Sequence, residues 1–176
     1  SSKLQALKLI KDAIEKNPEL APSLTSFVIS QGVGVSATVT TACQAAAKSD
    51  QAAAITAAAI QAAPPALAAA ITAAAISVSP KQAAAITTAA INAVLKQAPA
   101  ITSAAVTAAP LQANAITKAA LKAAGSTEVR RLIAVAASNA GVPVQVINNE
   151  LKNITNKNGA YEVFQKDTSN TVNSTM

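Results

Sequence analysis

The sequence contains no histidine and a single cysteine. Without histidine, zinc sites of the usual kind, histidine bases and Ser-His-Asp triads are excluded. One cysteine can form neither an internal disulfide nor a cysteine cluster. The 8 acidic residues are scattered, with no close pair in the central region, so a carboxylate dyad is unsupported. We therefore expect no enzyme, no cofactor and no metal site.

The cysteine, Cys43, lies among alanines. In such surroundings a free cysteine behaves as a small buried hydrophobe. The alternative is a reactive or pairing thiol, but no neighbouring base is present to activate it.

Aromatic and charged residues are both scarce, at 2% and 12% of the chain. The three aromatics are Phe27, Tyr161 and Phe164. Such a chain cannot build a thick core around bulky anchors, but alanine allows thin layers of closely approaching helices. The net charge is +6, yet the four lysines of the central region, Lys81, Lys96, Lys118 and Lys122, are dispersed. Nucleic-acid binding requires clustered Lys and Arg, so we expect no nucleic-acid partner.

No stretch has the character of a membrane span. The most apolar region, residues 51–79, is interrupted by Pro64-Pro65, and alanine contributes little to membrane insertion. No signal peptide is recognisable, and the chain begins Ser1-Ser2 without an initiator methionine. These features suit a processed mature protein or a trimmed chain. We expect a secreted or cell-surface location.

An Ile-Thr phrase recurs throughout residues 49–125, at steps of 16, 15, 15 and 15 residues. A second large aliphatic residue follows each isoleucine after five positions. The resulting candidate packing residues are Ile55, Ile60, Ile71, Ile76, Ile86, Ile91, Ile101, Val106, Ile116 and Leu121. A period of this length is typical of repeat architectures. The same 15-residue spacing continues on both sides of this region, at Leu9 with Ile14, Leu24 with Ile29, Val39, Leu132 and Ile147.

Prolines and helix caps separate the repeats, which excludes one continuous helix. Each unit is predicted to be a helix of about ten to thirteen residues followed by a turn of two to four. The fold class predicted is all-α: a two-layer α-solenoid of about ten short antiparallel helices, with about 15 residues per helix and about 30 per hairpin. Two local details are also expected: Ser36 caps a helix over 37–47, and the helix that ends at Gln97 extends beyond its neighbours.

The array is expected to fill residues 1–159, with cap helices at 3–16 and 143–155. The second cap pairs Val144, Ile147, Leu151 and Ile154 with an asparagine-rich back. Residues 160–176 form a polar tail that is expected to be disordered or extended.

A helical wheel places the threonine of each phrase inside the apolar arc. With the isoleucine at 0°, the threonine lies at about 100° and the second aliphatic residue at about 140°. The threonine hydroxyl is therefore predicted to be buried and to bond the carbonyl four residues back. Positions such as Ala57, Gln61, Thr88 and Asn92 form the expected solvent face.

The phrase from Gln82 to Ile91, followed by Ala98-Pro99, resembles the alanine-rich, proline-punctuated helical repeats of uncharacterised exported bacterial proteins. The resemblance covers about residues 17–125. It implies no activity and no functional residues.

Three functions are compatible with these patterns. The first is a non-enzymatic structural or interaction protein, a rigid scaffold that self-associates or binds another protein, for example in an extracellular filament or surface layer. Its candidate assembly tail contains Tyr161, Val163 and Phe164. Because both terminal helices have the character of caps, assembly is expected through side faces or the tail. The alternatives are an ice-binding protein and a groove-type protein-binding solenoid.

Overall fold

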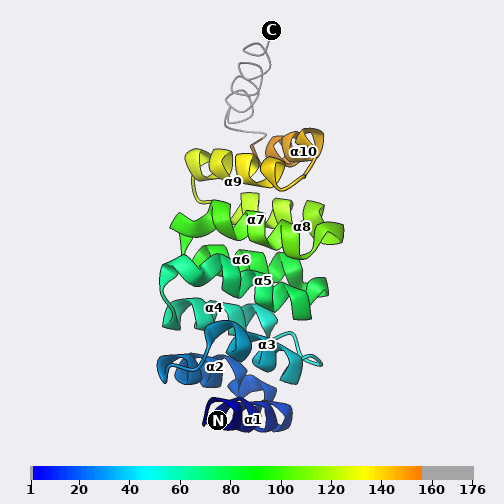
Figure 1. Cartoon of the computed structure of the whole chain (residues 1–176). Coiled ribbons are helices and arrows are strands. Elements are labelled where there is room, and N and C mark those ends of the chain that lie inside the picture. The colour runs from blue at the N-terminus through cyan, green and yellow to red at the C-terminus, as the bar shows by residue number, and fades with distance from the viewer. Residues whose placement is uncertain (1, 156–176) are drawn as a thin grey trace.

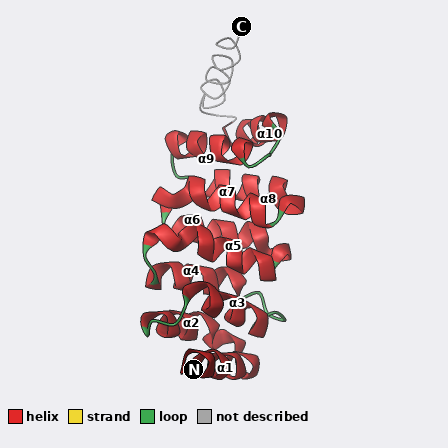
Figure 2. Cartoon of the chain, in the orientation of Figure 1, coloured by secondary structure: helices red, strands yellow, loops and turns green. Residues whose placement is uncertain are grey.

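In the computed structural model, residues 2–155 form a continuous stack of short helices with no strand among them (Figures 1 and 2). The ten α-helices are α1 (Ser2–Lys16), α2 (Ala21–Ser30), α3 (Val35–Ala45), α4 (Ala52–Ala62), α5 (Ala68–Val78), α6 (Ala83–Ala93), α7 (Ala98–Ala108), α8 (Ala113–Ala123), α9 (Thr127–Asn139) and α10 (Val144–Thr155). Residue 1 and residues 156–176 are not described. The expected tail and its residues Tyr161, Val163 and Phe164 lie outside the described residues.

The helices form two layers, because the most extensive contacts join helices that are two apart in the chain. The odd-numbered helices pack successively against one another in one layer, and the even-numbered helices do so in the other. Consecutive helices also touch, across the space between the layers. The stack runs from α1 at one end to α9 and α10 at the other (Figure 1). The predicted all-α repeat array of ten helices is therefore confirmed.

Helices α4 to α8 are copies of one unit of 11 residues. In each, the fourth, fifth, eighth and ninth residues are buried, which places one stripe of the helix in the core. Alanine fills most other positions and has the highest helix propensity. A 3-10 turn follows each of the first four units, at Pro65–Leu67, Pro80–Gln82, Leu95–Gln97 and Pro110–Gln112. The connection after α4 is one residue longer than the others, and this accounts for the single 16-residue step.

Two predicted helix boundaries are wrong. The helix expected to extend to Gln97 ends at Ala93, because Val94 leaves the helical region with φ −149° and ψ 78°. Its turn therefore matches the turns that contain proline. The third helix begins at Val35 rather than 37, its N-cap is Gly34, and no side chain bonds there. Ser36 lies inside the helix instead of capping it.

Not every residue in step with the repeat is buried. Ile14, Ile29, Val39 and Ile147 are buried, but Leu9 is 70% exposed. The first helix of the stack has no helix before it, so its outward side is uncovered.

The C-terminal helices depart from the repeat in a second way. Leu132 is also exposed, and its neighbour Ile133 occupies the core of α9 instead. In α10, Ile147 and Leu151 are buried and Ile154 is half-buried, whereas Val144 is exposed. The predicted apolar face of this helix is therefore correct only in part, since its first residue is exposed.

Candidate functional site

The ten packing residues of the repeat lie in one continuous core between the two layers. All are buried, and none exceeds 4% exposure: Ile55, Ile60, Ile71, Ile76, Ile86, Ile91, Ile101, Val106, Ile116 and Leu121. Each helix contributes one of them from its fourth position and one from its ninth. We call this line of residues, together with the threonine at the fifth position of each helix, the packing seam.

The threonines of the packing seam are fully buried, and each hydroxyl donates a hydrogen bond within its own helix. The acceptor is the carbonyl four residues back, at the first position of the unit. The Oγ1–O distances are 2.7 Å in Thr56, Thr72 and Thr87, and 2.8 Å in Thr102 and Thr117. Because the hydroxyl is satisfied locally, each threonine presents only its methyl group to the neighbouring helix.

Helix α3 carries a reordered version of the seam. Its fourth and fifth residues are Thr38 and Val39, the reverse of the aliphatic-threonine order, and Thr38 Oγ1 donates to the Gly34 carbonyl at 2.9 Å. Cys43 takes the ninth position, which isoleucine, valine or leucine holds in α4 to α8. Burial raises the pKa of its thiol to about 12. A buried thiol so resistant to ionisation is a poor nucleophile.

Arg130 joins α9 to the array, a contact that the repeat pattern does not reveal. Its Nε donates a hydrogen bond to the Leu121 carbonyl at 3.2 Å, near the C-terminus of α8. The N-cap of α9 is Ser126, whose hydroxyl accepts a hydrogen bond from the Val129 amide. Glu128 and Arg131 form an exposed ion pair at 2.8 Å. The hydrogen bond from Arg131 holds the pKa of the Glu128 carboxyl below its usual value.

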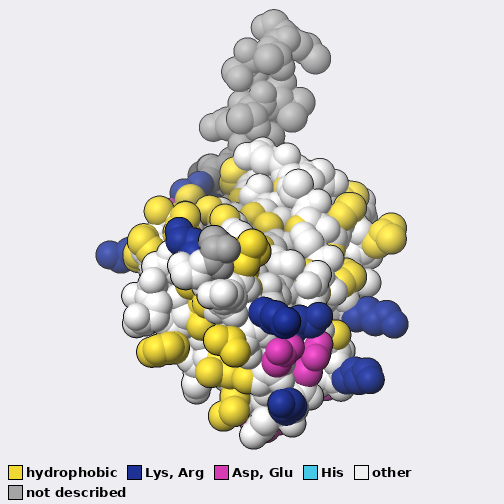
Figure 3. All heavy atoms as spheres, turned by 60° about the horizontal axis from the view of Figure 1, so that its bottom comes forward, with side chains coloured by type: hydrophobic (Ala, Val, Ile, Leu, Met, Phe, Trp, Pro, Cys, Tyr) yellow, Lys and Arg dark blue, Asp and Glu magenta, His cyan; other side chains and the backbone are white. Residues whose placement is uncertain are grey.

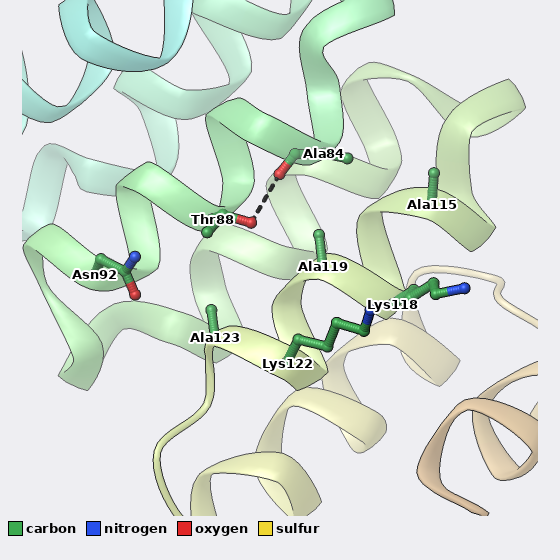
Figure 4. A pocket seen from close by; sticks show the side chains of 8 residues that line it. All are labelled: Ala84, Thr88, Asn92, Ala115, Lys118, Ala119, Lys122 and Ala123. Atoms are coloured by element: carbon green, nitrogen blue, oxygen red, sulfur yellow. Dashed lines mark hydrogen bonds between the residues drawn. The ribbon is translucent and has the colours of Figure 1, made fainter. Parts of the chain in front are cut away.

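A shallow groove of about 600 Å³ lies on the outer face of the even-numbered layer, between α6 and α8 (Figure 4). Its floor is alanine from both helices. Thr88 and Asn92 line it from α6, and Lys118 and Lys122 line it from α8. The Thr88 hydroxyl is already bonded to the Ala84 carbonyl at 3.0 Å. Lys118 and Lys122 are one helical turn apart in α8 and both exposed, so the groove can attract carboxylates.

The described residues contain no group of three or more acidic or cysteine side chains that could hold a metal ion. Among residues 2–155 there is also no helix with both the length and the apolarity that crossing a membrane requires. Comparison of the chain with protein-family models, with curated proteins and with solved structures returns no match.

Proposed function

We propose that the protein is a non-enzymatic structural protein, a rigid helical-repeat scaffold that associates with copies of itself in an extracellular filament or surface layer. One observation carries the proposal: the same packing seam is repeated in five successive helices with hydrogen-bond distances that differ by only 0.1 Å. The bacterial and exported character is what the resemblance of the repeat phrase implies.

The seam supports rigidity as well as regularity. Each fully buried isoleucine contributes roughly 1.5 to 3 kcal/mol relative to an exposed one. Every helix from α3 to α8 lies between neighbours on both sides of its own layer. Coupled units of this kind resist local opening, because one unit cannot unfold without breaking contacts with the next.

Self-association is tested with the purified full chain, by light scattering after size-exclusion chromatography and by electron microscopy over a range of concentrations. The proposal predicts species larger than one chain, with regular shape. Monodisperse monomers at high concentration would overturn it. A full-length variant with Tyr161→Ser and Phe164→Ser tests the tail as an assembly element. If the two aromatic side chains form the contact between chains, this variant should remain monomeric under conditions in which the unaltered chain assembles.

Groove-type protein binding is the second candidate, and the groove between α6 and α8 favours it. Lys118 and Lys122 make an acidic protein segment the partner that complements its charge. Calorimetric titration with an acidic peptide, compared with a neutral peptide of the same length, tests this candidate. Binding that is lost in Lys118→Ala/Lys122→Ala supports it, and equal affinity for both peptides counts against it.

The alternative of ice binding depends on regularly spaced threonines that are exposed at the surface. The threonines of the Ile-Thr phrases are buried, so they form no surface array that water or ice can reach. Thermal hysteresis of the purified protein is the measurement that would restore this alternative.

A further inference from the structure

Large apolar side chains are exposed mainly at the two ends of the stack. In the described part of the chain, seven of the ten exposed large hydrophobic residues lie either within residues 4–27 or within residues 132–144. They are Leu4, Leu9, Leu20, Phe27, Leu132, Val135 and Val144. The remaining three, Leu67, Leu95 and Leu111, all belong to turns along the stack. The middle helices therefore leave no large apolar side chain uncovered, whereas the terminal ones do.

The most informative of these residues is Phe27, which is 61% exposed and is the only aromatic in the described part of the chain. It is the seventh residue of α2. In α4 to α8 that position is always alanine: Ala58, Ala74, Ala89, Ala104 and Ala119. Ala119 lines the groove that α8 shares with α6, and Ala58 lines a hollow that α4 shares with Pro22, Ser26 and Phe27 of α2. The seventh position thus lies toward the helix two earlier.

Helix α2 has no helix two earlier, so the exposed part of Phe27 lies at the start of the even-numbered layer, where the side chain also borders the hollow with Ala58 of α4. Leu9 of α1 lies at the same end, because no helix precedes α1 in the odd-numbered layer, and it is 70% exposed. Viewed from this end, hydrophobic side chains lie beside a cluster of Lys, Asp and Glu side chains (Figure 3). Apolar side chains next to charged ones have the composition of a protein contact.

The number of helices allows a second copy to continue the stack. The described chain has ten helices, an even number, so it ends with α9 in the odd-numbered layer and α10 in the even-numbered layer. If the alternation between layers continued, an eleventh helix would pack beside α9 in the odd-numbered layer. A twelfth helix would pack beside α10 in the even-numbered layer. Helices α1 and α2 of another copy start the two layers in that order, so both layers continue without a change of hand.

We propose that copies of this chain stack end to end, with α1 and α2 of one copy packing on α9 and α10 of the next. Leu9, Leu20 and Phe27 supply the contact from one end, and Leu132 and Val135 supply it from the other. This contact is heterologous and does not close, so it generates a filament. End-to-end stacking is the opposite of the expectation from the sequence that the terminal helices are caps. The inference rests on the proposed self-association and names the surface that performs it.

The experiment uses three full-length variants. Leu9→Ser/Phe27→Ser alters the N-terminal end, Leu132→Ser/Val135→Ser alters the C-terminal end, and Leu111→Ser is the matched control. Leu111 is 98% exposed, but it lies in a turn along the side of the stack. Light scattering and electron microscopy are expected to show filaments for the unaltered chain and for the control. Each end variant should require at least about tenfold more protein to assemble, since buried aromatic and aliphatic anchors dominate such contacts.

Mixing the two end variants separates stacking from misfolding. Each variant retains one intact end, so an equimolar mixture is expected to form a dimer that neither variant forms alone. No dimer on mixing, with circular dichroism showing both variants folded, contradicts end-to-end stacking. Filaments that persist in both end variants also contradict it, yet leave the scaffold function standing. If the unaltered chain itself remains monomeric, both proposals fail.

Discussion

The Thr87 hydroxyl donates a hydrogen bond of 2.7 Å to the carbonyl of Ala83, and neither residue is more than 1% exposed. This pair explains how a polar residue can stand in every copy of an apolar seam. The carbonyl also belongs to the helix ladder, so it acts as acceptor for two donors of its own helix. The seam consequently needs no polar contact between helices.

Thr87→Val should therefore be tolerated. Valine keeps the shape of threonine, and the free energy of unfolding should fall by no more than about 1.5 kcal/mol, the net worth of one neutral hydrogen bond. Urea unfolding followed by circular dichroism measures the change. A loss of about 3 kcal/mol or more would mean that the hydroxyl bonds a neighbouring helix instead.

Leu95→Pro should stabilise the protein. Leu95 begins the 3-10 turn after α6, where the corresponding turns have Pro65, Pro80 and Pro110. The residue before it, Val94, has φ −149° and ψ 78°, close to the −139° and 72° of Ala109 before Pro110. Proline thus fits the native backbone and restricts the unfolded chain, for a gain of about 0.4 to 1 kcal/mol. The midpoint of urea unfolding should rise; a lower midpoint would show that the turn after α6 differs from the others.

The Cys43 thiol should not react with Ellman's reagent in the folded protein at mildly alkaline pH. Burial raises its pKa from 9.0 to about 12, so little of the reactive thiolate is present and the buried sulfur is inaccessible to the reagent. Full reaction is expected only after unfolding in guanidinium chloride. A stoichiometric reaction of the native chain would show that α3 opens readily.

The same pKa shift has a consequence for stability. Below pH 9.0 the thiol is protonated in both the folded and the unfolded state, so its stabilising contribution is complete. Between pH 9.0 and about 12 only the unfolded state loses the proton, and stability falls as the pH rises. Cys43→Ala should therefore reduce the loss of stability over this range compared with the unaltered chain.

Arg130→Met should weaken the attachment of α9. It removes the donor to the Leu121 carbonyl while keeping a long apolar side chain, and the expected cost is about 1 to 2 kcal/mol. Lys122→Met is the control, because an exposed lysine on α8 should change stability by no more than about 0.5 kcal/mol. Equal effects of the two substitutions in urea unfolding would remove the role assigned to Arg130.

The sequence predicts the helices and their phase because the Ile-Thr phrase is repeated almost without variation from Ile55 to Leu121. It predicts less well wherever the unit is altered. In α3, Ser36 is predicted as the N-cap of a helix that begins at 37, whereas the helix begins at Val35 with Gly34 as its N-cap. At Leu95 the absence of proline suggested a longer helix, although the backbone takes the same turn without it.

The ends of the stack could not be predicted from periodicity. Leu9 and Leu132 fit the 15-residue spacing of the repeat, yet both are exposed. The spacing predicts the side of the helix on which a residue lies, but it does not predict whether another helix covers that side. The contact between Arg130 and Leu121 depends on the path of the chain between α8 and α9, which carries no repeat signal. The groove between α6 and α8 arises from small residues on two helices 30 positions apart, and only the packed structure brings them together.

The central claim is that one stripe of each helix forms the seam and the opposite stripe faces water. Ile86→Ala and Asn92→Ala in the same helix test it most directly, since Ile86 is fully buried and Asn92 is exposed. Urea unfolding should show that the first substitution lowers the free energy of unfolding by about 2 to 5 kcal/mol, whereas the second changes it by less than about 0.5 kcal/mol. Equal losses from the two substitutions would contradict the account.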